Sequence, residues 1–182
     1  GKYTVTVRDE NGCTAETPAT IEEITGLPDL VITTPDPVCA PGTIDLTAES
    51  ITEGSDEDLT LSYWKDKDLT DEVDNPEAVA EPGIYYIRAK ADNGCYVVKD
   101  VEVTIWPELD EPEVDITQPD CDEPTGTIVI TAPLGADYTF SIDGADFQPE
   151  TTFENLAPGE YIVMVKDENG CTAGTPATIK EI

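Results

Sequence analysis

The sequence predicts an all-β protein made of tandem, small immunoglobulin-like β-sandwich domains, and three observations support this. The stretch 1–24 returns at 159–182 with about 18 of 24 positions identical, and more loosely at 83–106. Apolar and polar residues alternate as in strands with one buried face, and turn signals recur roughly every 8–12 residues without a helical period. A fixed repeat of this kind marks each copy as one structural unit.

Each copy of the repeat is predicted to form a β-hairpin. In the last copy Tyr161, Val163 and Val165 share one face, and the Asp-Glu-Asn-Gly that follows is a type I′ turn signal, because Asn and Gly both tolerate positive φ. A second strand, 172–182, is rich in Thr and Ile. Because a lone hairpin is marginally stable in water, each copy needs partner strands.

We expect three segments along the chain. Residues 1–26 are the C-terminal hairpin of a truncated repeat, 27–107 an immunoglobulin-like β-sandwich, and 108–182 a second β-sandwich repeat. Gly and Pro interrupt the first junction, and the acidic, Pro-containing stretch 106–115 is the second linker. The simplest arrangement is an alternating two-module array with a period of about 158 residues, which the parent chain would continue beyond Ile182.

Short strands are expected throughout the first sandwich. They cover 30–33, 43–48 and 59–65. An acidic loop at 49–58 and an irregular segment at 69–80 separate them from the hairpin that closes the sandwich.

The second sandwich carries two further signals. A strand at 126–131 is followed by a predicted hairpin in which 138–142 pairs with 145–147 across an Asp-Gly turn. Tyr161, after Leu-Ala-Pro-Gly-Glu, has the context of a tyrosine corner, in which the hydroxyl bonds upstream backbone. An ordinary half-buried strand tyrosine is the alternative. The equivalent residues in the other copies are Tyr3 and Tyr85.

Two cysteines per sandwich predict one intradomain disulfide in each. Cys39 and Cys121 precede a Gly-Thr-Ile strand and Cys95 and Cys171 follow hairpin turns, so the natural pairs are Cys39–Cys95 and Cys121–Cys171. Each bridge would close a loop of about 50 residues, worth roughly 4 kcal/mol in the chain-entropy model. Cys13 is then odd, with its partner expected upstream. Regular disulfides indicate an oxidising, extracellular compartment; the alternative is five unrelated thiols.

The charge excludes several classes of partner. With Asp+Glu 40, Lys+Arg 9 and no His, the formal net charge is −31, which is unsuited to nucleic acid or anionic membrane surfaces. No run of about 18 apolar residues predicts a membrane span. Because the chain has no His and its cysteines are assigned to bridges, we expect no enzyme. The acids themselves are explained by a solvated surface.

The segment 108–182 resembles a known family across its length. Its Pro-x-Cys, Gly-Thr-Ile strand, Tyr-Thr-Phe-Ser-Ile-Asp-Gly, Leu-x-x-Gly-x-Tyr and Lys-Asp-x-Asn-Gly-Cys-Thr are similar to the SprB-type repeat of Bacteroidetes gliding-motility adhesins. Segment 1–26 carries its last third, and 27–107 looks like the related immunoglobulin-like modules found beside such repeats. The resemblance implies very large cell-surface adhesins exported by the type 9 secretion system, and it carries over no catalytic residues.

Calcium is the metal hypothesis, because acidic linkers between extracellular sandwiches can bind Ca²⁺ through carboxylates and carbonyls. The candidates at the first junction are Glu22, Glu23 and Asp29. The candidates at the second junction are Glu108, Asp110, Glu111 and Asp115. Solvated charge without a metal is the alternative. Trp64 and Trp106 could stack sugars if exposed, whereas packing in the core or linker is the other interpretation.

Two functions are compatible with these patterns. The first is a structural stalk segment of a large repetitive cell-surface adhesin, which spaces a distal adhesive region from the cell, with gliding motility as one setting. Its partners are neighbouring repeats of the same chain. The alternative is a carbohydrate- or surface-binding extracellular module, whose partners are glycans or surfaces.

Overall fold

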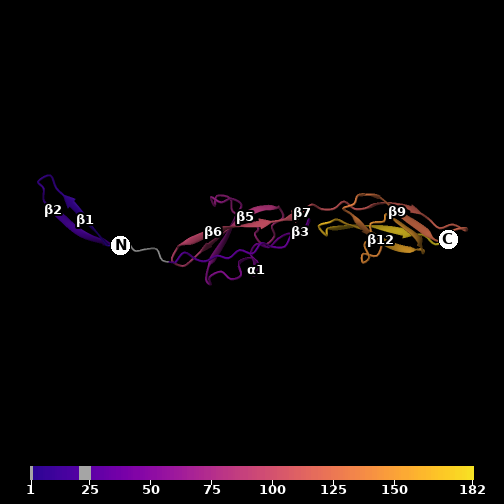
Figure 1. Ribbon diagram of the computed structural model, residues 1–182, viewed down its shortest axis with the longest axis horizontal. Helices are drawn as coiled ribbons and strands as arrows, with labels where there is room; N and C mark the ends of the chain where they lie inside the picture. Colours follow the sequence, from indigo (N-terminus) through magenta and orange to yellow (C-terminus); the bar gives the residue numbers. More distant parts are fainter. Residues whose placement is uncertain (1, 21–25) are drawn as a thin grey trace. The chain divides into compact units, whose positions relative to one another are not determined.

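The computed structural model describes residues 2–20 and 26–182, and this part of the chain is almost entirely β (Figure 1). Its elements are β1 Lys2–Arg8, β2 Thr14–Thr20, β3 Val38–Cys39, α1 Glu49–Thr52, β4 Thr60–Trp64, β5 Gly83–Lys90, β6 Tyr96–Val103, β7 Ile105–Trp106, β8 Glu113–Thr117, β9 Gly126–Ala132, β10 Thr139–Ser141, β11 Thr152–Leu156, β12 Gly159–Lys166 and β13 Thr172–Ile179. The predicted all-β class is confirmed.

The chain divides into two compact units, each described by itself below. Unit 1 takes Gly1–Pro35, Asp45–Glu77 and Ile84–Glu102, and unit 2 takes Asp36–Ile44, Ala78–Gly83 and Val103–Ile182. Unit 2 therefore includes three short segments, 36–44, 78–83 and 103–107, from the stretch in which the sequence predicts the first sandwich. The boundaries of the three predicted segments stay a prediction.

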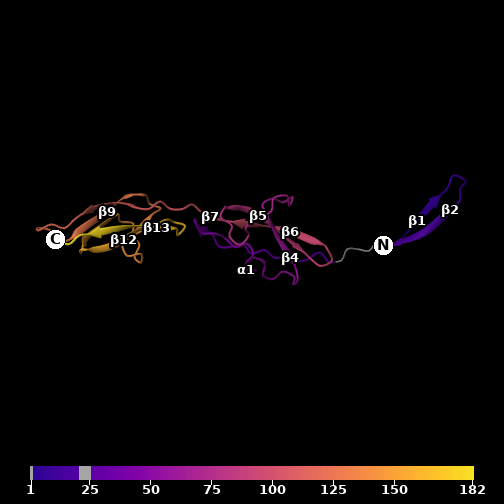
Figure 2. The same ribbon diagram turned by 180° about the vertical axis from the view of Figure 1, so that it is seen from behind.

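Unit 2 contains an immunoglobulin-like sandwich. One three-stranded antiparallel sheet has the order β11-β9-β8 and the other has the order β10-β12-β13. Figure 2 labels β9 of the first sheet and β12 and β13 of the second. Named in chain order, these six strands correspond to the A, B and E strands of one immunoglobulin sheet and the C, F and G strands of the other, without a D strand. The predicted fold is therefore confirmed from strand order.

The core of unit 2 lies on the inward-facing positions of both sheets. Ile128 on β9, Phe140 on β10, and Val163 and Val165 on β12 belong to one buried cluster and are each at most 1% exposed. Their alternation with less buried neighbours is the period of a strand with one covered face. On β9, a Cβ added to Gly126 would lie 2.6 Å from the Cδ1 atom of Ile179, so the Gly of the Gly-Thr-Ile strand permits close packing.

Tyr161 at the start of β12 forms the predicted tyrosine corner. Its hydroxyl donates a hydrogen bond of 2.9 Å to the carbonyl oxygen of Ala157. The bond fixes the turn that carries the chain into the strand. The equivalent Tyr85 is 8% exposed and Tyr3 is 57% exposed, so the three copies of the repeat differ in how far this position is covered.

Unit 1 is built on the antiparallel sheet β4-β5-β6. Trp64 on β4 pairs with Tyr86 on β5, which places both on the outer face. On the inner face of β5, Ile87 and Ala89 are fully buried. The predicted strand at 59–65 is thus confirmed, with Trp64 on the face opposite Tyr63.

The predicted strand at 30–33 is wrong. Leu30 is fully buried, but the backbone around it bonds to a loop instead of a neighbouring strand. The amide of Val31 donates to the hydroxyl of Ser55, and the amide of Thr33 donates to the carbonyl of Ile51, both at 2.8 Å. Hydrogen-bond acceptors on the Ser55 side chain and on the Ile51 backbone therefore replace the interstrand hydrogen bonds that the sequence pattern predicts.

The predicted strand at 43–48 is reduced to one isolated bridge between Ile44 and Val79. Ile44 and Leu46 are buried as expected, at 4% and 0% exposure. The acidic loop that follows begins with the short helix α1, whose Ile51 is buried.

The three repeat turns share one geometry, which is not type I′. In the first, the amide of Gly12 donates to the carbonyl of Asp9 at 3.1 Å and the amide of Asp9 donates to the carbonyl of Cys13 at 3.0 Å. Gly12 has a φ of 86°, and the preceding Asn11 is not among the described residues with positive φ. This is a type I turn followed by a left-handed glycine. The Asp9 carboxylate accepts from the amides of Asn11 and Cys13, but the turn from Ala91 to Cys95 has the same backbone hydrogen bonds with an alanine at the equivalent position.

Two predictions near unit 2 need correction. The predicted linker at 106–115 ends early, because β8 begins at Glu113. In the predicted hairpin after β10, Phe140 pairs with Gln148 and not with 145–147. A network around Asp143 occupies the turn, where its carboxylate accepts from the hydroxyl of Ser141 at 2.7 Å.

Candidate functional site

One disulfide bond is present among the described residues, and it joins two cysteines that the sequence did not predict to pair. Cys39 and Cys171 are linked with Cα atoms 5.6 Å apart and a sequence separation of 132. Both lie in unit 2. Cys13, Cys95 and Cys121 are free thiols. The predicted pairs Cys39–Cys95 and Cys121–Cys171, and with them one intradomain bridge per sandwich, are therefore wrong.

The strand geometry explains why the predicted pairs do not form. Cys39 lies on β3, which runs parallel to β7, and pairs with Trp106 after the end of β6. Cys95 precedes the first residue of that eight-residue strand. An eight-residue strand spans roughly 26 Å, whereas the two Cα atoms of a disulfide lie within about 7 Å.

The same reasoning applies to the second predicted pair. Gln118, three residues before Cys121, donates from its side-chain amide to the carbonyl of Thr178 at 2.9 Å, near the end of β13. Cys171 directly precedes the first residue of β13. Each hairpin-turn cysteine therefore lies at one end of its last strand, and each cysteine before a Gly-Thr-Ile strand lies at the other end. The length of that strand was the sequence signal that could have shown this, because eight residues separate its two ends too far for a disulfide.

The outer face of β4-β5-β6 in unit 1 carries aromatic and basic side chains. Trp64 and Tyr86 are cross-strand neighbours on this face. The guanidinium carbon of Arg88 lies 4.4 Å from the ring centroid of Tyr96, a cation–π contact. In a chain with 40 acidic and 9 basic residues, this concentration of rings and positive charge is the feature of unit 1 most suited to contact a ligand.

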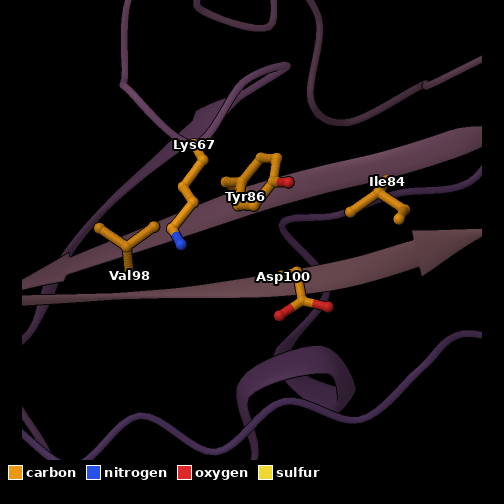
Figure 3. A pocket seen from close by; sticks show the side chains of 5 residues that line it. All are labelled: Lys67, Ile84, Tyr86, Val98 and Asp100. Carbon is orange, nitrogen blue, oxygen red and sulfur yellow. The ribbon is translucent and has the colours of Figure 1, made fainter.

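A shallow hollow of about 550 Å³ lies on the same face. Figure 3 shows Tyr86 and Ile84 from β5, Val98 and Asp100 from β6, and Lys67 from the loop after β4 around it. One aromatic ring, two aliphatic side chains, a carboxylate and an ammonium group can stack against and hydrogen-bond a sugar ring.

The sugar-stacking hypothesis requires exposed tryptophans, and the structure does not place Trp64 and Trp106 in that way. Both are partly buried. The indole nitrogen of Trp64 donates to the hydroxyl of Ser62 at 3.0 Å, and Trp106 lies on β7 beside Cys39. Tyr86 rather than either tryptophan lines the hollow.

The acidic residues proposed for calcium are solvent-exposed where the structure describes them. Glu22 and Glu23 lie outside the described residues, and Asp29 is exposed. The four candidates of the second junction, Glu108, Asp110, Glu111 and Asp115, are also exposed, with Asp115 on strand β8. Within 2–20 and 26–182 no three His, Cys, Asp or Glu side chains are grouped so as to hold a metal ion. Calcium at the linkers stays a prediction, which a comparison of melting temperatures in EDTA and in millimolar Ca²⁺ tests.

Strand order, the tyrosine corner and the disulfide together define unit 2 as a disulfide-bonded, immunoglobulin-like β-sandwich. No protein-family model matches the chain, and no curated protein matches it. Among solved structures, the ectodomain of human desmocollin-1 is similar over 94% of this chain and 40% of its own, with 13% identity and a TM-score of 0.31. The chain thus spans less than half of that ectodomain, and a likeness at this level carries no argument about function.

In the described part of the chain, no helix is long and apolar enough to cross a membrane.

Proposed function

We propose that this chain is a structural stalk segment of a large, repetitive cell-surface adhesin, which spaces a distal adhesive region from the cell. The observation that carries the proposal is the recurrence of one hairpin: residues 1–24 and 159–182 match in sequence, and their turns have the same hydrogen bonds and the same glycine conformation. Tandem arrays gain length because repeated units are joined in series and each unit contacts its neighbours.

Two further features support an extracellular setting. Disulfides persist in oxidising compartments such as the cell exterior. The Cys39–Cys171 disulfide therefore supports an extracellular location. A formal charge of −31 keeps neighbouring stalks apart by repulsion. The resemblance of 108–182 to the SprB-type repeat adds the more specific proposal of a Bacteroidetes adhesin exported by type 9 secretion, in gliding or in other surface attachment.

Small-angle scattering tests the stalk function. We expect the maximum particle dimension to grow linearly when a second copy of residues 25–182 follows Ile182, because units in series add their lengths. A maximum dimension that hardly changes on duplication would mean that the copies fold back on each other and would contradict a spacing role.

The second candidate is a carbohydrate- or surface-binding module, favoured by the hollow around Tyr86. A glycan array probed with the fragment tests it. If a glycan binds, Tyr86→Ala should abolish the signal, whereas Ile162→Ala, which removes an exposed apolar side chain from unit 2, should not. A fragment that binds no glycan leaves the stalk as the function.

A further inference from the structure

We propose that the disulfides of this protein link consecutive modules of the array, each joining the early cysteine of one module to the hairpin-turn cysteine of the next. The inference rests on the tandem-array part of the proposed function. Cys39 belongs by sequence to the predicted module 27–107 and Cys171 to the predicted module 108–182, and they are bonded within the compact unit 2, which takes in residues of both. The partners of the three free cysteines are then cysteines of neighbouring modules.

The amide of each hairpin-turn cysteine donates to a side-chain oxygen of its own turn. The amide of Cys13 donates to the carboxylate of Asp9 at 2.8 Å, and the amide of Cys171 donates to that of Asp167 at 2.8 Å. The amide of Cys95 donates at 2.9 Å to the side-chain oxygen of Asn93. The glycines before them have φ of 86°, 86° and 87°. Cys171 forms a disulfide from this turn, and Cys13 and Cys95 occupy the same position in theirs.

The two early cysteines are also held at corresponding places. The amide of Val38 donates to the carbonyl of Thr104 at 3.2 Å, which fixes Cys39 beside the last strand of its module. The amide of Lys180 donates to the side-chain oxygen of Gln118 at 2.8 Å, which fixes the segment before Cys121 beside β13.

Cys121 is exposed in an ordered turn. The carboxylate of Asp120 accepts hydrogen bonds of 2.9 Å from the amides of both Asp122 and Glu123. The thiol next to this carboxylate is therefore presented by a defined backbone and lies at the end of the module where the chain leaves it.

Cys95 lies at the opposite end of its module, where the chain enters. The side-chain amide of Asn93, in the turn before Cys95, donates at 3.0 Å to the carbonyl of Gly26, the residue before the module begins. In chain order, the entry end adjoins the preceding module and the exit end adjoins the following one.

One rule then accounts for every free thiol. Cys121 bonds the Cys95 equivalent of the next module, and Cys95 bonds the Cys121 equivalent of the preceding one. Cys13, equivalent to Cys171, bonds a Cys39 equivalent. Each bond converts two thiols into one disulfide, and the two protons and two electrons pass to an external disulfide oxidant, which is reduced to two thiols.

A duplicated chain tests the rule: residues 1–182 followed directly by residues 25–182, refolded with reduced and oxidised glutathione. Mass spectrometry of the unreduced digest should contain a peptide that links Cys121 to Cys95, besides the Cys39–Cys171 peptide. The tether supplies an effective concentration in the millimolar range, so the bond should form at low micromolar protein.

Two matched variants identify which copies are joined. Cys121→Ser in the first copy should abolish the Cys121–Cys95 peptide, and Cys121→Ser in the second copy should leave it unchanged. Both variants should retain the Cys39–Cys171 peptide, which shows that they fold.

A Cys121 of the first copy that stays free, or that bonds within its own copy, overturns the inference. The scattering experiment separates this failure from failure of the stalk function. Unlinked copies whose maximum dimension still doubles would leave a stalk without the proposed disulfides, and linked copies in a compact particle would retain the disulfides without the stalk.

Discussion

At the scale of single residues, turns in this protein are fixed by carboxylates and by one phenol. Asp9, Asp120, Asp143 and Asp167 each accept backbone amides from residues that follow them. Such bonds satisfy turn amides that no strand partner reaches. Acidic residues are therefore used locally to build structure as well as to keep the surface solvated.

Tyr161→Phe should lower the free energy of unfolding of unit 2 by about 1 kcal/mol, because it removes the hydrogen bond to Ala157 without changing the packed ring. Hydrogen exchange of the β12 amides measures the loss. Tyr3→Phe, at the equivalent but exposed position, is the matched control and should change little. Equal effects of the two substitutions would contradict a tyrosine corner.

Asp143→Asn should destabilise unit 2 in a pH-dependent way. Hydrogen bonds from the amide of Ala145, the hydroxyl of Ser141 and the amide of Asp146 lower the pKa of Asp143 below its usual 3.8. A depressed folded pKa gives stability that is present above the unfolded pKa and is lost as the pH falls through the folded pKa. The melting temperature of Asp143→Asn should therefore be lower than that of the wild type at pH 6, with the difference shrinking below pH 3.8.

The exposed Glu154→Gln provides the control for this experiment, since it also removes one negative charge from unit 2. A melting-temperature difference for Asp143→Asn that is as large at pH 2.5 as at pH 6 would contradict the assignment.

At the scale of elements, two nearly identical hairpins have different surroundings. Val163 on β12 is fully buried, whereas Val5, its equivalent on β1, is 49% exposed. In unit 2 the covering residues come from β9 and β10. The hairpin β1-β2 therefore presents half of a sandwich core, including Tyr3 and Val7, which are 57% and 66% exposed.

Val163→Ala should cost roughly 2 kcal/mol of stability in unit 2, because it removes buried methyl groups and leaves a cavity. Val5→Ala should cost close to nothing in the present chain. When residues 108–158 are added before Gly1, the covering strands become available and Val5→Ala should become as costly as Val163→Ala. Urea unfolding of the matched pairs measures this, and a Val5→Ala cost that stays near zero would show that the hairpin is not part of such a sandwich.

Local chemistry made the hairpins, the β4 and β9 strands and the tyrosine corner predictable. Asn-Gly turns, period-two alternation and the Leu-x-x-Gly-x-Tyr context act over a few residues, so their consequences are visible in the sequence. The turn type was missed because an Asn-Gly pair predicts positive φ at both residues, whereas only the glycine adopts it in these turns.

Long-range pairing was not predictable in the same way. The segment at 30–33 is apolar enough for a strand, but its amides bond to Ser55 and Ile51, which are distant in sequence. β8 was assigned to a linker because Pro and acidic residues surround its alternating Val114 and Ile116. The cysteine pairing failed because two cysteines per predicted module imply nothing about which end of the module each one occupies.

At the scale of the whole molecule, the bond between Cys39 and Cys171 changes how a stretching force would travel along the chain. Tension applied at the two termini passes from Cys39 through the sulfur atoms directly to Cys171, so the intervening backbone bears almost none of it. A separation of 132 residues corresponds to roughly 450 Å of extended polypeptide. Optical-tweezers unfolding should lack this length in the oxidised chain and recover it after reduction or in Cys39→Ser. Cys121→Ser should behave like the oxidised wild type, and recovery of the full length without reduction would contradict the bridge.

If the other cysteines are bonded between modules, a cell pulling on such a fibre loads only a few residues per module, and the fibre tolerates forces that unfold individual sandwiches without lengthening.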